Sequence, residues 1–209
     1  MKNLVIAGAG GFGREVYAWA KGHPDCGQLW EIKGFIDDNP AALDGLNYAV
    51  PVLGSIDTYS YSTEDVFLCA IGAPKVKRSV VERMLGKGAV FISLVHPTAV
   101  LGESVSIAEG VIICPGAVVT CDVTIGRFVA INCLSGIGHD VCLGDWTTLS
   151  GHCDVTGHVT IGESCFLGSG ARILPGKRIG RDVLVGAGSV VLNSLADGQR
   201  VFGNPAREF

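Results

Sequence analysis

The sequence predicts a two-part fold, in which a small Rossmann-like α/β domain precedes a parallel β-solenoid. Two observations support this prediction. From Val95 to Val191, an aliphatic residue occupies every sixth position without interruption. Before Val95, strand-like apolar segments alternate with segments of helical spacing. We therefore assign residues 1–94 to the α/β domain, 95–192 to the solenoid and 193–209 to a C-terminal cap, because solenoid ends need capping.

The period of the repeat excludes a helix. An amphipathic helix repeats its apolar face every 3.6 residues, so a strict six-residue period indicates a β-solenoid built of hexapeptides. Three hexapeptides complete one coil, and residue i should lie directly below residue i+18. Glycine follows eight of the aliphatic residues, and we expect it to permit tight corners. The seventeen inward positions are Val95, Leu101, Ile107, Ile113, Val119, Ile125, Ile131, Ile137, Leu143, Leu149, Val155, Ile161, Leu167, Ile173, Ile179, Val185 and Val191.

The first 94 residues contain alternating strand-like and helical segments. In the first helical segment Val16, Trp19 and Ala20 should share the buried face, and in the second Val76, Val80 and Met84 should do so. The pattern predicts a doubly wound α/β domain. We expect strands at residues 2–7, 30–36, 65–71 and 90–95, with the first helix at residues 14–21.

Composition and charge exclude several classes of protein. Of 209 residues, 48% are hydrophobic and only 17% are charged, which excludes an intrinsically disordered chain. The net charge is −4 and no run of Lys or Arg occurs, so we expect no nucleic-acid partner and no membrane surface. There is no apolar stretch of transmembrane length and no signal peptide, which predicts a cytoplasmic protein.

The eight cysteines do not form a metal-binding pattern. No two of them are spaced as a Cys-x-x-Cys pair, so a zinc site of that kind is not expected. We expect them to be reduced, mostly buried, small apolar residues.

A glycine-rich turn follows the first predicted strand. Gly8-x-Gly10-x-x-Gly13 matches a dinucleotide fingerprint in the required place between strand and helix. Asp37 ends the second predicted strand, where such an acid would bind a ribose hydroxyl. The domain is too short for a dehydrogenase, which favours the nucleotide of a sugar nucleotide over NAD. A tight turn without any ligand is the alternative.

The whole chain resembles one group of the hexapeptide-repeat acyltransferases, the bacterial nucleotide-aminosugar N-acetyltransferases and sialic-acid O-acetyltransferases. The shared motifs are Gly-Ala-Gly-Gly-Phe-Gly-Arg-Glu (8–15), Gly-Phe-Ile-Asp-Asp-Asn (34–39), Ala-Ile-Gly (70–72), His-Pro-Thr-Ala (96–99) and Val-Phe-Gly-Asn-Pro-Ala-Arg (201–207). The resemblance implies a left-handed parallel β-helix, a homotrimer and acetyl-CoA bound at clefts between prisms. It also implies that the nucleotide is held by Gly10, Gly11, Gly13, Gly72, Asp37 and Asp38.

The resemblance singles out His139 and Asp140 as the catalytic pair. In the similar N-acetyltransferases, a His followed by an acid is the proposed general base and its helper, with Glu where this chain has Asp140. Histidine is suited to base catalysis near neutral pH, and a neighbouring carboxylate fixes its tautomer. Both residues should point outward from a corner of the prism. A surface His–Asp turn without function is the alternative.

Further residues match positions near the base or the cofactor. Asn132 lies one face before His139, and an internal asparagine ladder is an equal alternative. Gly157 is 139 + 18 and should lie one coil above His139. There it could let the pantetheine arm pass and offer an amide to the thioester, although a plain corner glycine is as good an explanation. The matching cofactor positions further along are Ser169, Ala187 and Gly188.

The favoured function is an acetyl-CoA-dependent N-acetyltransferase that acts on a nucleotide-linked amino sugar in bacterial surface-glycan biosynthesis. A sialic-acid O-acetyltransferase is the alternative within the group. A non-catalytic scaffold or a metal hydratase would be a different class. His152 and His158 could suggest a metal, but they are six residues apart on successive faces and a third ligand is not apparent, so no metal is expected.

Overall fold

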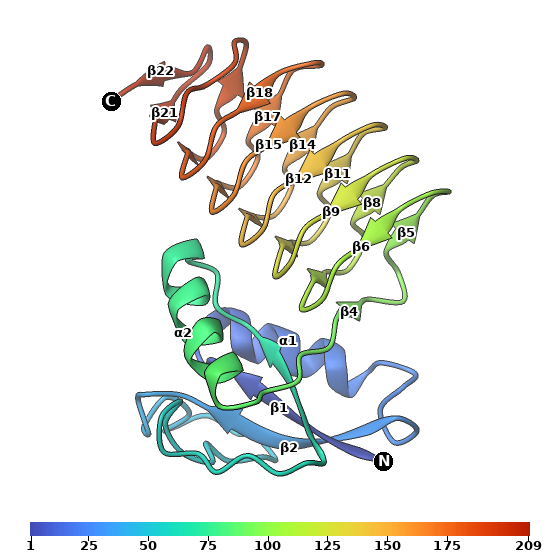
Figure 1. Ribbon diagram of the computed structural model, residues 1–209, viewed down its shortest axis with the longest axis vertical. Helices are drawn as coiled ribbons and strands as arrows, with labels where there is room; N and C mark the ends of the chain where they lie inside the picture. The colour runs from blue at the N-terminus through green and yellow to red at the C-terminus, as the bar shows by residue number, and fades with distance from the viewer. The chain divides into compact units, whose positions relative to one another are not determined.

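The computed structural model describes all 209 residues, which divide into two compact units, Met1–Leu94 and Val95–Phe209 (Figure 1). The first unit contains a parallel three-stranded sheet in the order β2-β1-β3. This confirms the predicted α/β architecture. The elements of this unit are β1 (Lys2–Ala7), α1 (Gly11–Lys21), β2 (Trp30–Ile36), β3 (Asp65–Cys69) and α2 (Pro74–Gly86).

Three boundaries differ from the prediction. Helix α1 begins at Gly11, inside the glycine-rich turn, and β3 ends at Cys69. The fourth strand expected at residues 90–95 does not form. Phe91 makes an isolated bridge to Phe67, and the end of the segment becomes β4 (Leu94–Val95), the first strand of a solenoid sheet. One apolar run therefore contributes to two sheets, which periodicity alone could not reveal.

The buried faces of the helices are also offset from the prediction. Val76 is 53% exposed, whereas Lys77, Val80, Val81 and Met84 are buried. Positions i, i+4 and i+8 drift by about 40° per step around a helix, and i, i+3, i+4 and i+7 stay closer to one face. In α1, Tyr17 is buried and Trp19 is only half-buried.

The second unit is a parallel β-solenoid of eighteen-residue coils, which confirms the repeat prediction (Figure 1). Its strands form three sheets, here named faces. The first face contains β4, β7 (Ile112–Ile113), β10 (Ala130–Ile131), β13 (Thr148–Leu149), β16 (Phe166–Leu167), β19 (Leu184–Val185), β21 (Arg200–Phe202) and β22 (Arg207–Glu208). The second face contains β5 (Val100–Leu101), β8 (Val118–Val119), β11 (Gly136–Ile137), β14 (Asp154–Val155), β17 (Arg172–Ile173) and β20 (Val190–Val191). The third face contains β6 (Ser106–Ile107), β9 (Thr124–Ile125), β12 (Cys142–Leu143), β15 (Thr160–Ile161) and β18 (Arg178–Ile179).

The coils stack in the predicted register. On the second face Ile137 pairs with Val119 on one side and with Val155 on the other, eighteen residues away in each direction. The predicted aliphatic residues are buried from Ile113 to Val191. Leu101 remains 38% exposed because the first coil has a neighbouring coil on one side only. The core of this unit is therefore a column of stacked aliphatic side chains.

The repeated glycines have a different role from the one expected. The glycine after the inward residue does not adopt a left-handed conformation, but a Cβ at Gly138 would lie 2.6 Å from the Gly157 nitrogen of the next coil. These glycines allow close stacking of coils. Positive φ angles occur two residues later, as at Asp140 (φ 58°) and His158 (φ 58°). Asp and His are among the few non-glycine residues that tolerate this region.

The tail after Val191 adds further pairing to the solenoid. Leu195 bridges Ile179, and β21 pairs parallel with β19 and antiparallel with β22. Val201 is buried in the aliphatic column. The tail thus supplies one more strand to the first face before the chain turns back.

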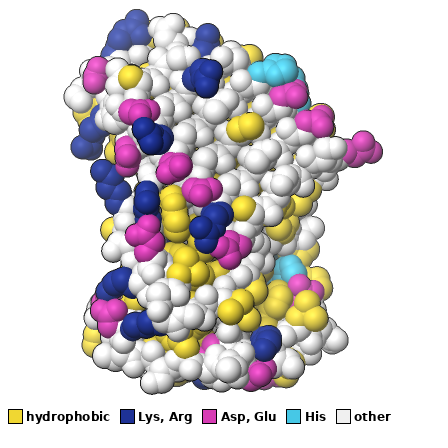
Figure 2. Space-filling model, in the orientation of Figure 1, with side chains coloured by type: hydrophobic (Ala, Val, Ile, Leu, Met, Phe, Trp, Pro, Cys, Tyr) yellow, Lys and Arg dark blue, Asp and Glu magenta, His cyan; other side chains and the backbone are white.

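The surface carries mixed charge and two accessible thiols. Figure 2 shows Lys and Arg side chains interspersed with Asp and Glu on the face in view. All eight cysteines are free thiols, but the expectation that most are buried is wrong: Cys121 and Cys142 are exposed, and only four are buried. Cys121 lies in an outer corner of the solenoid, where side chains point to solvent. Neither helix has the length and apolar content to cross a membrane.

Candidate active site

His139 and Asp140 lie at an exposed corner of the solenoid, directly after β11 on the second face. The inward-facing Ile137 fixes the phase of this hexapeptide, so the two following turn residues project outward, as the repeat predicts. The left-handed conformation of Asp140 turns the backbone toward the third face. The backbone nitrogen of Asp140 donates to the Cys121 carbonyl oxygen one coil below (3.2 Å). The corner is thus held by the stacking of the coils.

The two side chains form a short hydrogen bond. His139 Nδ1 lies 2.7 Å from Asp140 Oδ2. This hydrogen bond holds the pKa of the Asp140 carboxyl below its usual value, and the nearby His158 and His139 charges act in the same direction. An ionised carboxylate can only accept hydrogen bonds, so the Nδ1 atom of His139 carries the proton. The Nε2 atom of a neutral His139 then presents a lone pair, as a general base requires.

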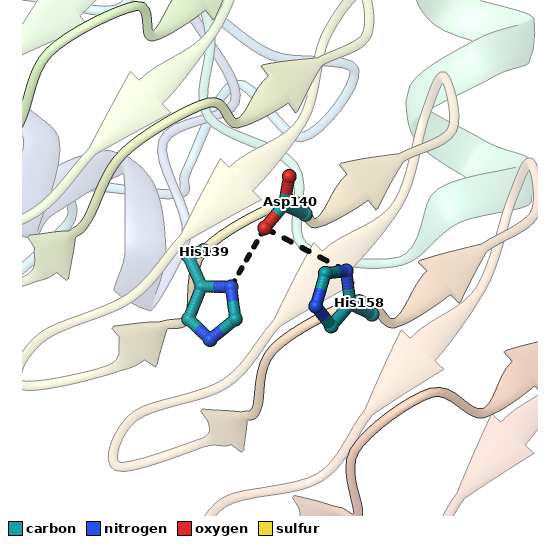
Figure 3. Close-up of side chains that lie close together, drawn as sticks. All are labelled: His139, Asp140 and His158. Carbon is teal, nitrogen blue, oxygen red and sulfur yellow. Dashed lines mark hydrogen bonds and ion pairs between the residues drawn. The ribbon is translucent and has the colours of Figure 1, made fainter.

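A third residue, His158, joins this pair (Figure 3). His158 Nδ1 lies 3.6 Å from Asp140 Oδ2. The rings of His139 and His158 meet edge to face, with centroids 4.9 Å apart and planes at 90°. We did not predict this role for His158 from the sequence. The sequence contained the necessary information, because His158 follows Asp140 by eighteen residues and must therefore lie one coil above it.

The same three residues bear on the question of a metal. Their ligand atoms lie within 4.8 Å of one another, so the expectation that His158 has no suitable companions is wrong. The companions are His139 and Asp140, and not His152. Within this group, His139 Nδ1 and Asp140 Oδ2 are joined by the 2.7 Å hydrogen bond. The arrangement as it stands therefore suits proton transfer.

Gly157 leaves room for the His139 ring. A Cβ at Gly157 would lie 2.6 Å from His139 Nε2 and 2.7 Å from Cε1. The basic nitrogen therefore faces the backbone of the coil above it. A groove of about 300 Å³ on the second face ends at this point, and its lining includes Gly136, Gly138, Thr156 and Gly157. The corner thus offers a base beside a shallow groove.

The other predicted cofactor residues lie at a different corner. Ser169, Ala187 and Gly188 follow strands of the first face, and the Gly188 nitrogen donates to the Ser169 carbonyl oxygen (2.8 Å). Within one chain the second face separates them from His139. Asn132 also follows a strand of the first face. Its amide donates to the Leu149 carbonyl oxygen (2.9 Å), as an internal ladder would require.

A second site occupies the first unit, where a pocket of about 450 Å³ borders the glycine-rich turn. Helices α1 and α2 both begin at this pocket, and neither has a side-chain N-cap or an acidic residue in its first turn. Two uncapped helix N-termini favour an anionic group such as a phosphate. The pocket lining is Gly8, Gly10, Gly11, Phe12, Asp37, Asp38, Ile56, Ala70, Ile71, Gly72, Ala73, Val76 and Val80.

The glycines of the pocket have two different roles. A Cβ at Gly13 would lie 1.9 Å from the Gly8 carbonyl oxygen, so Gly13 allows the helix to pack on the turn. A Cβ at Gly10, Gly11 or Gly72 would meet nothing within 4 Å. These three positions border open space, as close approach of a ligand requires.

The two acids hold the walls of the pocket. Asp37 Oδ2 accepts from the Ala9 nitrogen (2.7 Å), and Asp37 Oδ1 accepts from the Asn39 nitrogen (2.8 Å). Asp38 Oδ1 accepts from the Ile56 nitrogen (3.1 Å), and Asp38 forms an ion pair with Arg83 (3.7 Å). Asp37 therefore ties the glycine-rich turn to the end of β2. Sequence reasoning missed Val76 as part of this pocket, because it placed Val76 on the buried face of the second helix.

Comparison with known families agrees with both units. Residues 3–84 match the PglD N-terminal domain, and residues 158–193 match the bacterial transferase hexapeptide (six repeats). GDP-perosamine N-acetyltransferase from Escherichia coli O157:H7 is 32% identical over 97% of this chain and 94% of its own length. The fold and the site thus define a hexapeptide-repeat acyltransferase.

Two solved structures resemble the whole chain. One is the acetyltransferase domain of PglB from Neisseria gonorrhoeae in complex with acetyl coenzyme A, with a TM-score of 0.87, 28% identity, and coverage of 100% of this chain and 99% of that one. The other is PerB from Caulobacter crescentus in complex with CoA and GDP-perosamine, with a TM-score of 0.89, 31% identity, and coverage of 100% and 98%. The chain belongs to the family of sugar N-acetyltransferases that includes GDP-perosamine N-acetyltransferase.

Proposed function

We propose that the protein transfers the acetyl group of acetyl-CoA to the amino group of a nucleotide-linked amino sugar, in bacterial surface-glycan biosynthesis. The observation that carries the proposal is the His139–Asp140 hydrogen bond beside the groove of the second face. It supplies a base of defined tautomer at an accessible position. The complexes of PglB with acetyl coenzyme A and of PerB with GDP-perosamine support the two substrates.

In the proposed reaction the sugar amine, neutral after its ammonium form has lost a first proton to solvent, attacks the thioester carbonyl carbon as His139 Nε2 accepts a second proton from the nitrogen. A carbon–nitrogen bond forms, and the tetrahedral intermediate carries the negative charge on oxygen. The carbon–sulfur bond then breaks, and the proton held by His139 passes to the leaving thiolate. The products are the acetamido sugar and CoA with a free thiol. Asp140 stabilises the imidazolium during transfer.

The binding residues belong to the same proposal. Gly10, Gly11, Gly13 and Gly72, with Asp37 and Asp38, would form the nucleotide site in the first unit. Gly157, Ser169, Ala187 and Gly188 would contact the cofactor, and Asn132 would lie near the acceptor. Because Ser169 and His139 occupy different corners, one prism offers the cofactor only part of its site. A homotrimer would bring corners of different chains together, and analytical ultracentrifugation showing a fully active monomer would contradict this. The proposed location is the cytoplasm.

An acetyl-transfer assay with several acceptors tests the function. The protein is incubated with acetyl-CoA and GDP-, UDP- or dTDP-linked amino sugars, and with a free sialic acid. We expect release of CoA thiol and an acetamido product with one nucleotide-linked amino sugar only. That ligand should also stabilise the protein by about 2.7 kcal/mol at one hundred times its Kd. Transfer to sialic acid alone would identify the O-acetyltransferase alternative, and no transfer to any acceptor would overturn the proposal.

Replacing Asp37 tests the nucleotide site. Asp37→Ala removes the acceptor of two backbone N–H groups, so the glycine-rich turn should lose its fixed position against β2. We expect the KM for the acceptor to rise about tenfold, because a hydrogen bond to a charged group contributes about 1.5–3 kcal/mol. The Kd for acetyl-CoA should not change. Asp44→Ala, at an exposed acid in the segment after β2, is the control. An unchanged acceptor KM in folded Asp37→Ala would restrict Asp37 to a capping role.

A further inference from the structure

We propose that His158 is a positioning residue for the His139–Asp140 pair: it shares the Asp140 carboxylate with His139, keeps the His139 imidazole oriented, and opposes a positive charge on that ring. The inference rests on the proposed role of His139 as the base. It adds to the site a residue that acts on His139 through Asp140 and through ring contact, without itself receiving the substrate proton.

The backbone of the solenoid fixes the place of His158. The pairing of Ile137 with Val155 sets β11 against β14. The His158 nitrogen then donates to the His139 carbonyl oxygen (2.9 Å) across the two turns. Both Asp140 and His158 have φ angles of 58°, so their side chains leave stacked turns in matching directions. The contact between them is therefore determined by the register of the coils.

Contact with His158 limits the freedom of the His139 ring. An exposed histidine side chain ordinarily samples several rotamers. Here one edge of His139 is held by Asp140 at 2.7 Å, and its ring meets the His158 ring edge to face at 4.9 Å. Gly157 bounds the Nε2 side of the ring. These contacts from three directions leave His139 in the orientation that Figure 3 shows.

His158 competes with His139 for interaction with the Asp140 carboxylate. In the turn below, Asp122 is acidic, and desolvation together with the Asp122 charge raises the pKa of the Cys121 thiol, which therefore adds no charge near neutral pH. In the turn above, residues 174–176 contain no titratable side chain. Asp140 is thus the one carboxylate that lies against both imidazoles. A positive charge on one imidazole disfavours a positive charge on the other, and both rings share the one carboxylate.

The chain itself provides matched variants for a test. Phe128 and Trp146 occupy the same turn position as His158, with φ angles of 56° and 67°, so His158→Phe is compatible with this backbone. It keeps an aromatic ring against His139 and removes the charge. His158→Asn keeps a residue suited to positive φ and removes both the ring and the charge. Asp182, which has φ 56° and follows β18 of the third face, at a corner without any proposed site residue, supplies the control Asp182→Phe.

The experiment measures kcat against pH for the wild type and the three variants, and follows the His139 imidazole by NMR titration. For His158→Phe we expect the acidic limb of the kcat profile to move to higher pH by about half a unit, because the variant removes a positive charge from beside the His139 ring. Its plateau should stay near the wild-type value. For His158→Asn the acidic limb of the kcat profile should move similarly. The plateau value of kcat should fall about threefold to tenfold, because the His139 ring is no longer held in its orientation. The control should match the wild type.

The NMR titration separates this inference from the proposed function. If His158→Phe and His158→Asn leave both the His139 titration midpoint and the plateau unchanged in folded protein, the inference is wrong. If the midpoint moves as expected but His139→Asn retains wild-type kcat, His158 positions His139 and the base assignment fails. A change in thermal stability without a change in either profile would mean that His158 is only structural, and would also overturn the inference.

Discussion

His139→Asn should lower kcat by about 10²–10⁴-fold, the usual contribution of a general base. Asparagine has similar polarity and approximate size, so the corner after β11 should keep its fold and cofactor binding should survive. The measurement is steady-state kinetics with the acceptor identified above, with the Kd for acetyl-CoA determined separately. The rate of the wild type should also fall as pH drops and the imidazole of His139 takes up a proton.

Two companion variants sharpen this prediction. Asp140→Asn should cost less than His139→Asn, since it removes the charge that supports the imidazolium but leaves the base in place. Asp182→Asn changes an exposed residue after β18, at a corner without any proposed site residue, and should have wild-type kinetics. If His139→Asn instead raises KM with kcat almost unchanged, the substrate amine loses its proton to water and His139 only binds substrate.

Gly157→Ala should lower kcat by about 10²-fold while the protein stays folded. The added Cβ would lie 2.6 Å from His139 Nε2, and the exposed ring is the group that can move. Rotation of the ring would break the 2.7 Å bond to Asp140, and displacement of a catalytic group by about 1 Å can cost this much in rate. The φ angle of Gly157 is not positive, so alanine should not strain the backbone there.

Gly86→Ala is the control, because Gly86 ends α2 outside both proposed sites, its φ angle is not positive and its Cβ would meet nothing within 4 Å. It should retain wild-type kcat. Titration with acetyl-CoA distinguishes the two roles considered for Gly157. A raised Kd for acetyl-CoA with normal kcat would favour the passage of the pantetheine arm over clearance for His139.

Much of the site could be predicted because the solenoid converts sequence spacing into spatial position. The six-residue period placed His139 and Asp140 on an outward corner, and the rule i+18 placed Gly157 next to His139. The same rule applied to Asp140 leads to His158, yet His158 was considered only with His152 as a metal ligand. In the α/β unit, the spacing of Gly8, Gly10 and Gly13 favoured a nucleotide-binding turn before the first helix, and a pocket borders that turn.

The sequence by itself determined the two-part architecture and the register of the coils, because a strict aliphatic period can be buried in only one way. The tertiary structure alone decided which side chains meet. Asp37 holds backbone amides of two segments, the Asn132 side chain donates to a backbone carbonyl oxygen of the next coil, and one carboxylate serves both His139 and His158. Such contacts depend on the φ angles and side-chain rotamers of the turn residues. The repeat does not specify these, because many kinds of side chain are compatible with a turn position. A pattern of burial therefore specifies the core, and the geometry of the turns specifies the site.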